Sequence, residues 1–544
     1  MSAFAHAHKR KDLGLQTWRQ SGEGGRKWPV ERKLPSAAFF NRATRKQLVP
    51  LSALQAEKPG SLVSVRGVRG ERQQKPEQTV RSLVLAQLLR VEDKGAYAAL
   101  ATGAPSSESR PTDTLSAQDR RDVTRLVSEI LRWKRKLDHI IDGLNGDYHR
   151  RGASKDGRRG KLPKPFDSRV RQILRMGAYE LYFAQKPAYV VNEYVNLAKG
   201  IGNARKAAGL INSLLRKVTM YVEEEYSTED FLAMERAELV EVLGNRHSHP
   251  NWLIDRWLTR FGLEDCLDLL EYNNARPRYC LRTNPCHGLD TEEMKRKAEA
   301  AGVEFSETSY LEDFIVIEKG LQKVFSAGLM QDRLCSVQDI SAGLVVDLMD
   351  PKAGEEVLDV CAAPGGKFYY AAARMNYEGK LVALDASRNR MRALENGIRR
   401  FPDSLVTETH SVAFEAWSAE NEGVLFDKVL VDAPCSGTGV LAKRADLRWR
   451  REAEDLQELT EIQSRLLNHA KNHVKVGGIL CYSTCSIEEE ENSGRIMAFL
   501  RENPEFEVEE MPGTLDVKKD GFLQTFPHQH KIDGAFAARL VKRK

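Results

Sequence analysis

Short apolar runs that alternate with helical stretches over residues 356–485 constrain the fold of this chain more than any other feature. Four of these runs have the length and composition of buried strands, namely "EVLDVC", "KLVALD", "KVLVDAP" and "GGILCYSTC". Strands that alternate with helices predict a doubly wound, Rossmann-like α/β sheet that is parallel in its core. Because ligands of such sheets bind at the carboxyl ends of the strands, the residues at those ends are the first candidates for a functional site.

The turn after the first strand is the candidate cofactor loop. It consists of Cys361, Ala362, Ala363, Pro364, Gly365, Gly366 and Lys367. It departs from the G-x-G-x-x-G pattern of dinucleotide sites, and Phe368 stands where a phosphate-binding loop needs Ser or Thr. Asp385, at the end of the second strand, can accept hydrogen bonds from both ribose hydroxyls. A nucleoside cofactor without a pyrophosphate fits this pattern, and we predict S-adenosylmethionine.

Two thiols follow the next two strands. "VDAPCSGTG" contains Asp432 and Cys435, and "YSTCSIEEEEN" contains Cys485. Paired strands lie roughly 5 Å apart, so both thiols could face one substrate. A thiolate that adds to carbon 6 of a pyrimidine turns the ring into an enamine whose carbon 5 can accept a methyl group, which is covalent catalysis by an activated cysteine. The chemistry alone leaves open which thiol attacks.

Four consecutive acids, Glu488 to Glu491, follow the second thiol. Ser486 and Glu489 have the spacing of a capping box, so we expect a helix that begins directly after Cys485 and whose dipole favours the thiolate. Acids that pointed inward would raise the pKa of the thiol, and we therefore expect all four to face solvent. Cys481, inside the strand, is expected to be an inert core thiol.

Upstream of the sheet, apolar residues at helical spacing from about Pro76 onward predict a helical bundle. Gly, Pro and basic residues between Asn145 and Pro165 predict a loop that interrupts it. The stripe of Leu, Val and Tyr is more typical of a core than of a binding face, so this basic loop and not the stripe is the candidate contact for a polyanion such as a nucleic acid.

From about Ser248 the pattern changes to helix, strand, helix and strand, which predicts a small α/β module. His247, His249, Cys280 and Cys286 lie in or beside it, without the C-x-x-C or H-x-x-x-H spacing of a metal site. We expect them to be structural.

Positive charge is concentrated in the N-terminal segment of the chain. Residues 1–75 contain 16 Lys and Arg against 5 Asp and Glu, a balance of +11, whereas the whole chain carries +6. This segment lacks sustained periodicity, which predicts disorder, and it can be a solvated tail, a nucleic-acid arm or an organelle transit segment. All eight cysteines are expected to be reduced thiols, and no apolar stretch is long enough to cross a bilayer.

The motifs "LDVCAAPGGK", "VDAPCSGTG", "YSTCSIEEEEN" and "FPHQHKIDGAFAARL" resemble the Nop/Sun family of RNA cytosine-5 methyltransferases. "RMGAYELYF" and "GLINSLLRKV" resemble the NusB-like RNA-binding bundle, which makes the chain similar to the RsmB branch that acts on small-subunit ribosomal RNA. The resemblance covers Pro76 to the C-terminus. It implies three parts: a NusB-like all-α domain (76–222), a linker with a small α/β RNA-binding module (223–344) and a methyltransferase domain (345–544). The basic extension (1–75) lies outside the resemblance.

The positions that match the family's motifs in this sequence are the candidate residues named above. The resemblance implies that Cys485 is the nucleophile, that Cys435 is needed to release the product and that Asp432 contacts the cytosine. It also places the cofactor at Cys361 to Lys367, at Asp432 and, through its ribose, at Asp385. No metal is implied.

Two positions depart from the family. An Asp near the adenine is usual at the end of the third strand, and here His410 or Ser411 occupies that place. The Arg-His-Pro-Asp that often follows the Pro-Cys motif is replaced by "KRAD", which keeps only the carboxylate of Asp446. The first departure puts the affinity for the cofactor or the orientation of its adenine in doubt.

Three hypotheses follow. The favoured one is an RNA cytosine-5 methyltransferase that acts as a monomer on ribosomal RNA or an assembling small subunit. The second is a non-catalytic ribosome-assembly factor on the same fold, although both cysteines are retained. The third is a methyltransferase acting on protein or a small molecule, for which paired thiols have no use. For the extension we favour transit to a plastid, with the mitochondrion and the cytoplasm as alternatives.

Overall fold

The structure is a computed structural model of the 544-residue chain. It describes residues 79–94, 116–152, 166–284, 290–330, 335–399, 401–510 and 518–544. The chain divides into two units, Met1–Lys75 and Pro76–Lys544. The predictions for residues 1–75 fall outside the described residues.

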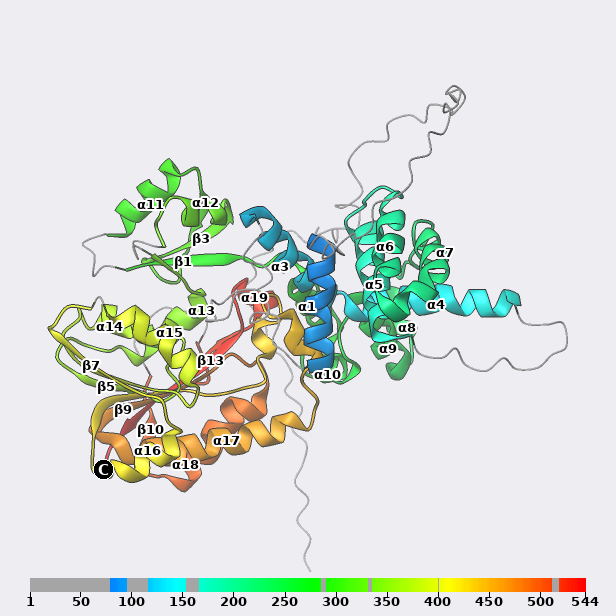
Figure 1. Ribbon diagram of the computed structural model, residues 1–544. Helices are drawn as coiled ribbons and strands as arrows, with labels where there is room; N and C mark the ends of the chain where they lie inside the picture. The colour runs from blue at the N-terminus through cyan, green and yellow to red at the C-terminus, as the bar shows by residue number, and fades with distance from the viewer. Residues whose placement is uncertain are drawn as a thin grey trace, which may run out of the picture. The chain divides into compact units, whose positions relative to one another are not determined.

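The first part of the second unit is a helical bundle, as predicted (Figure 1). Its core is the apolar stripe of each helix, and Leu88, Val127, Ile141, Ile173 and Leu215 are all nearly inaccessible. A π-helical turn, Tyr179–Phe183, follows α5, and a 3-10 helix, Gly202–Ala207, precedes α7. The helices are α1 (Val80–Lys94), α3 (Ala117–Arg132), α4 (Lys134–Gly152), α5 (Ser168–Ala178), α6 (Val190–Lys199) and α7 (Ala208–Val218).

The predicted loop Asn145–Pro165 is wrong in its first part, because α4 continues to Gly152. A glycine inside a helix costs only about 1 kcal/mol, and the buried residues Leu137, Ile140 and Ile141 anchor the preceding turns. The rest of the loop, including Arg158 and Arg159, lies outside the described residues.

The middle part holds the small α/β module. Two of its strands were predicted from "RPRYCLRTN" and "FIVIEKG", and two shorter strands, of four and three residues, complete a sheet of order β2-β3-β1-β4. Strands this short carry too few positions for an alternating pattern. The elements are α8 (Thr228–Ala233), α9 (Arg236–His247), α10 (Asn251–Asn274), β1 (Tyr279–Thr283), α11 (Thr291–Ala300), β2 (Glu304–Glu307), β3 (Phe314–Lys319), α12 (Leu321–Ser326) and β4 (Cys335–Val337).

The last part is the predicted doubly wound sheet. Strand order is β11-β12-β13-β9-β8-β5-β6-β7, in which β7, β6, β5, β8 and β9 are parallel and β13 pairs antiparallel with β9. The strands are β5 (Glu356–Asp359), β6 (Gly379–Leu384), β7 (Leu405–His410), β8 (Phe426–Asp432), β9 (Val474–Thr484), β10 (Phe506–Val508), β11 (Lys518–Lys519), β12 (Phe522–Thr525) and β13 (Ala535–Lys542).

Helices cover both faces of this sheet, because alternate strand residues point to opposite faces and both sets are apolar. Val357 packs in one cluster with α13, α14 and α15, whereas Leu358 packs in another with α16, α17 and α18. Figure 1 shows α14 and α15 on one side of the strands and α16, α17 and α18 on the other. The helices are α13 (Ile340–Met349), α14 (Gly366–Arg374), α15 (Arg388–Ile398), α16 (Phe414–Glu420), α17 (Asp455–Ala470), α18 (Ser493–Glu502) and α19 (Pro527–His530).

Among the described residues, no helix combines the length and the apolar character that a membrane crossing requires.

Candidate active site

The two predicted thiols meet at the carboxyl edge of the sheet. β8 and β9 pair in parallel with Asp432 opposite Ser483, as expected for successive strands that lie side by side. Cys485 follows the end of β9 directly, and Cys435 lies three residues beyond the end of β8. Their Sγ atoms are 3.3 Å apart, and both residues are partly exposed. Both sulfurs can therefore reach one substrate atom.

The two sulfurs differ in acidity. A hydrogen bond from the Cys435 thiol lowers the pKa of Cys485 below its ordinary value, although burial opposes this, and the positive charge of Lys367 adds to the lowering. The same hydrogen bond to Cys485, together with burial, holds the pKa of Cys435 well above its ordinary value. The pair therefore loses its first proton from Cys485 and keeps the second on Cys435.

Asp432 joins the thiols to the cofactor loop. Its Oδ2 accepts a hydrogen bond of 2.9 Å from Lys367 Nζ, and its Oδ1 accepts one of 2.8 Å from Ser483 Oγ. Burial alone would lower the pKa of Lys367, but the Asp432 carboxylate raises it above its ordinary value. A carboxylate and an ammonium group are thus fixed beside the reactive sulfurs.

The candidate cofactor loop is a tight turn from β5 into α14. Gly365 has φ of 110°, a conformation that favours glycine, and α14 begins at the next residue. The turn begins beside Asp359, whose Oδ1 accepts a hydrogen bond of 3.3 Å from Cys361 N. Burial and the nearby Asp432 charge raise the pKa of this buried carboxyl to about 8. Sequence reasoning missed Asp359, although an acid inside an apolar strand run is an unusual signal.

Asp385 has the geometry that a ribose partner requires. Its Oδ1 accepts hydrogen bonds from Ser387 N at 2.7 Å and from Arg390 Nη2 at 2.9 Å. Its Oδ2 is buried and has no hydrogen-bond partner among the described residues, although buried carboxylate oxygens are ordinarily paired. A vicinal diol of a nucleoside would satisfy this oxygen. The residues at these strand ends therefore fit S-adenosylmethionine.

His410 ends β7 beside this carboxylate. Its backbone oxygen accepts a hydrogen bond of 3.2 Å from Asp385 N, and Leu384 lies opposite it in the pairing of β6 and β7. His410 Nε2 is buried and lies 3.7 Å from Glu408 Oε2, while Ser411 is exposed. Of the two residues that could replace the usual Asp, His410 is the one with a buried polar atom at the strand end.

The prediction that all four acids after Cys485 face solvent is wrong. Glu489 and Glu490 are exposed, but Glu488 and Glu491 are 1% and 0% exposed. The capping box is also absent, because Ser486 Oγ accepts from Glu488 N, and α18 begins only at Ser493. A thiolate at Cys485 is therefore favoured by Cys435 and Lys367 and not by a helix that starts directly after it.

Glu491 instead holds the loop that carries Cys435. It accepts hydrogen bonds of 2.8 Å from Ser436 N, 2.5 Å from Ser436 Oγ and 3.1 Å from Gln463 Nε2. Its own carbonyl accepts one of 2.7 Å from the Tyr482 hydroxyl. Because Ser436 follows Cys435 directly, this buried carboxylate fixes the position of the Cys435 sulfur. Sequence reasoning missed this role.

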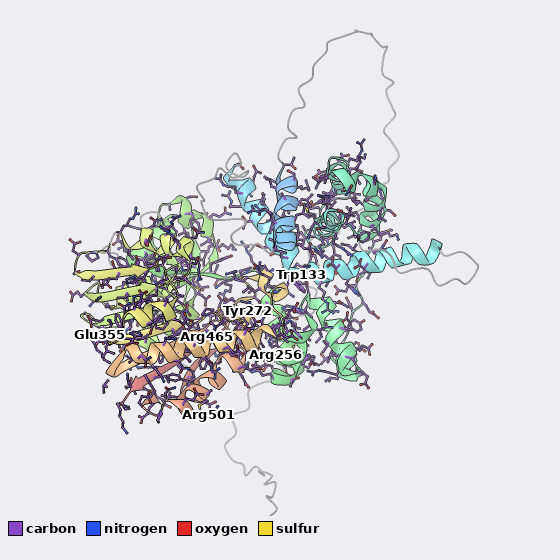
Figure 2. All side chains as sticks on the ribbon, turned by 60° about the horizontal axis from the view of Figure 1, so that its bottom comes forward. Trp133, Arg256, Tyr272, Glu355, Arg465 and Arg501 are labelled. Carbon is purple, nitrogen blue, oxygen red and sulfur yellow. The ribbon has the colours of Figure 1, made fainter. Side chains whose placement is uncertain are left out.

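The other three acids of this run, Glu488, Glu489 and Glu490, contact side chains of helix α10. One of these side chains, Arg256, is labelled in Figure 2. Arg256 Nε donates to Glu488 at 3.0 Å and Trp257 Nε1 donates to the same carboxylate at 3.2 Å. Arg256 also pairs with Glu490 at 2.8 Å, and Arg260 pairs with Glu489 at 3.3 Å. The segment after Cys485 is thus attached to a helix that lies more than two hundred residues earlier in the chain.

The other candidate residues lie away from the reactive sulfurs. Cys481 is fully buried, and burial raises its pKa to about 12, as suits an inert core thiol. Cys280 is buried in β1, and His249 Nδ1 lies 2.7 Å from the His247 carbonyl oxygen. Cys286 lies outside the described residues.

Comparisons with known proteins agree with this architecture. Family models match for the 16S rRNA methyltransferase RsmB/F (residues 346–541), the ferredoxin-like domain of RsmF/B-like methyltransferases (249–323) and the NusB family (160–220). The "Probable ribosomal RNA small subunit methyltransferase B" of Bacillus subtilis (strain 168) is 30% identical over 474 residues, 86% of this chain and 99% of that protein.

The protein of the same name in Synechocystis sp. (strain ATCC 27184 / PCC 6803 / Kazusa) is 31% identical over 448 residues, 79% of this chain and 92% of that protein. Among solved structures, the crystal structure of PH0851 matches with a TM-score of 0.67 and 25% identity, over 87% of this chain and 100% of that one.

Proposed function

Because the chain belongs to the RsmB/F family of ribosomal RNA small subunit methyltransferases, we propose that it methylates carbon 5 of a cytosine in small-subunit ribosomal RNA. The methyl donor is S-adenosylmethionine, and the reaction passes through a covalent bond between Cys485 and carbon 6 of the base. The observation that carries this proposal is the pair of sulfurs 3.3 Å apart, of which only Cys485 has a lowered pKa.

Cys485 supplies the nucleophile. Its thiolate forms a bond from Sγ to carbon 6, and the electron pair of the carbon 5 to carbon 6 double bond moves to carbon 5. Bound S-adenosylmethionine supplies a methyl group that leaves its bonding electrons on the cofactor's sulfur. Asp432, with its lysine and serine partners, is placed to hold the polar edge of the cytosine while charge develops in the ring.

Cys435 is placed to complete the reaction. After methyl transfer, carbon 5 carries both a methyl group and a hydrogen. Removal of that hydrogen as a proton restores the double bond and expels Cys485 as a thiolate. The largest cause of the raised pKa of Cys435 is its hydrogen bond to the Cys485 sulfur. Because alkylation of Cys485 removes that cause, Cys435 becomes a stronger acid at the stage at which it must act as a thiolate base.

The test uses the full-length protein, small-subunit ribosomal RNA and radiolabelled cofactor. Cys485→Ala should abolish both methyl transfer and any covalent complex, while Cys435→Ala should accumulate an RNA adduct that survives a denaturing gel. Cys481→Ala is the matched control and should behave as the unaltered protein. The opposite pattern for Cys485 and Cys435 would reverse the two roles, and labelled product other than 5-methylcytosine would refute the proposed position.

We propose further that residues 1–75 direct the chain to a plastid, because the segment is basic and precedes the domains that match the family models. The mitochondrion is the second candidate. A fluorescent fusion of the full chain, compared with one that lacks Met1 to Gly70, tests this by its position in cells.

A further inference from the structure

A cavity of about 180 Å³ lies apart from the two thiols and has no role in the mechanism above. Tyr272 near the end of α10 (labelled in Figure 2), Pro277 and Ala442 contribute apolar and ring surfaces to its lining. Drug-sized ligands occupy pockets of about 300–1,000 Å³, so this cavity suits a smaller group. A single planar ring is a guest of suitable size and shape.

The interior of the cavity carries an acid with one oxygen that lacks a hydrogen-bond partner among the described residues. Asp533 lines it and is 4% exposed. Its Oδ2 accepts a hydrogen bond of 2.9 Å from Lys443 Nζ, but its Oδ1 has no hydrogen-bond partner among the described residues. Burial and the nearby Asp339 charge raise the pKa of Asp533 to about 7, so the carboxyl can either accept or donate. A guest with polar ring atoms would satisfy the unpaired oxygen.

The mouth of the cavity is basic. Arg276, Arg278 and Lys531 line it, and all three are exposed. Arg278 is paired with Glu318 at 2.6 Å. The Lys443 ammonium inside the cavity is already paired with Asp339 and Asp533, which disfavours a phosphate there. Exposed guanidinium and ammonium groups favour a phosphate at the entrance. This distribution of charge matches a nucleotide whose uncharged base enters the cavity and whose phosphate stays outside.

Backbone contacts connect the cavity to the nucleophile. Gly534, the neighbour of Asp533, donates a hydrogen bond of 2.8 Å to the Gly439 carbonyl, and Gly439 N donates one of 3.0 Å to the Cys485 carbonyl. A Cβ atom on Gly439 would lie 2.4 Å from the Gly534 carbonyl oxygen, so the two segments can approach this closely only through glycine. The cavity and the reactive sulfur thus belong to one packed assembly.

We propose that this cavity binds the base of a nucleotide that flanks the target cytosine, and that it contributes to the choice of that cytosine. The inference rests on the proposed function, because it assumes an RNA substrate held at Cys485. Tyr272 supplies a ring face, Asp533 reads the polar edge of the base and Arg276 binds the adjacent phosphate.

The test combines variants of the cavity with an abasic scan of the RNA. The probe is a short single-stranded segment of small-subunit ribosomal RNA, chosen because it crosslinks to the full-length chain. A series of this RNA is made in which each nucleotide in turn lacks its base. Ala275 is exposed and lines the cavity, so Ala275→Leu fills it without removing a polar contact. Ala300→Leu is the matched control, because Ala300 is an exposed alanine on α11 that does not line the cavity.

For the unaltered chain and for Ala300→Leu, one abasic position should weaken RNA binding about tenfold, the order expected for the loss of one stacked base. For Ala275→Leu, removal of the same base should weaken RNA binding about twofold or less, because the cavity no longer accepts the base. Arg276→Ala should weaken intact and abasic RNA equally. Unchanged cofactor binding shows that each variant is folded.

Equal abasic costs in the unaltered chain and in Ala275→Leu would overturn the proposal. Failure of the proposed function would give a different result, because the unaltered chain would then bind the RNA and show the abasic effect without methylating a cytosine.

Discussion

The contacts of individual residues determine the chemistry of the candidate site. Cys435 and Cys485 are both cysteines at strand ends, yet their hydrogen bond and Lys367 make only Cys485 more acidic than usual. Glu488 and Glu491 belong to a run of four acids, yet only these two are buried. Residue type alone therefore does not identify which thiol attacks or which acid supports it.

The rate of methyl transfer should rise with pH through the pKa of Cys485 and level off above it, because only the thiolate attacks. Cys435 lowers this pKa most and Lys367 adds to the effect, so removing either group should move the titration to higher pH. The measurement is the pH dependence of alkylation of Cys485 by iodoacetamide, which requires no turnover.

Cys435→Ala should cause the larger shift of the alkylation profile and Lys367→Met a smaller one in the same direction. Cys481→Ala serves as the control and should leave the profile in place. A downward shift in either of the first two variants would contradict the assigned causes.

Glu491→Gln should lower kcat while leaving the KM for the cofactor unchanged, because the amide cannot accept from Ser436 and Gln463 as the carboxylate does. Loss of a partner for these buried donors should also cost about 1–3 kcal/mol of folding free energy. Chemical denaturation and steady-state kinetics measure the two effects. Glu489→Gln, at an exposed neighbour, should change stability by less than about 0.5 kcal/mol.

At the level of elements, α10 and the segment after β9 form one unit. Arg256 and Trp257 on α10 both donate to Glu488, and Arg260 donates to the Ile487 carbonyl. Leu441 and Ile487, from the methyltransferase part, share an apolar cluster with residues of α9 and α10. A displacement of α10 would therefore disturb the segment that directly follows Cys485.

Arg256→Ala should destabilise the protein by about 1–3 kcal/mol, because it leaves the buried Glu488 carboxylate with one donor fewer. It should also lower the extent of adduct formation at Cys485 without changing cofactor affinity. Arg236→Ala is the comparison, since its ion pair with Asp255 is exposed on both sides and should contribute less than about 1 kcal/mol. Equal effects of the two substitutions would argue against the contact with Glu488.

For the whole molecule, we expect RNA binding and methyl transfer to depend on different parts of the chain. The basic segment between α4 and α5 follows a helix of the bundle, whereas the reactive sulfurs lie at the edge of the C-terminal sheet. Phosphate contacts by such a segment would add affinity without selecting a sequence, and selectivity should come from the bundle, the α/β module and the cavity lined by Tyr272 and Asp533.

Replacing Arg150, Arg151, Arg158 and Arg159 together with Gln should weaken RNA binding and flatten its dependence on salt, because fewer counterions are released. Cofactor binding, measured by calorimetry, should stay the same. A chain that starts after Gly70 is the comparison, and if the extension is a transit segment its salt dependence should match that of the full chain. A shallower slope for the shortened chain would indicate an RNA arm instead.

The sequence by itself determined the parallel sheet, the turn that is the candidate cofactor loop and the meeting of Cys435 with Cys485. These features follow from local periodicity and from one geometric rule, that the carboxyl ends of parallel strands share an edge. Asp359 and the extent of α4 escaped sequence reasoning, because an acid in a strand and a glycine in a helix are both tolerated when distant residues pack around them.

Only the tertiary structure decided the protonation of the two thiols, the burial of Glu488 and Glu491 and the cavity around Asp533. Each of these depends on residues far apart in the chain: Trp257 reaches Glu488 across 231 positions, and Ser436 reaches Glu491 across 55. A local pattern cannot specify such partners, because burial and the electrostatic environment of a group are set by whatever the folded chain places around it.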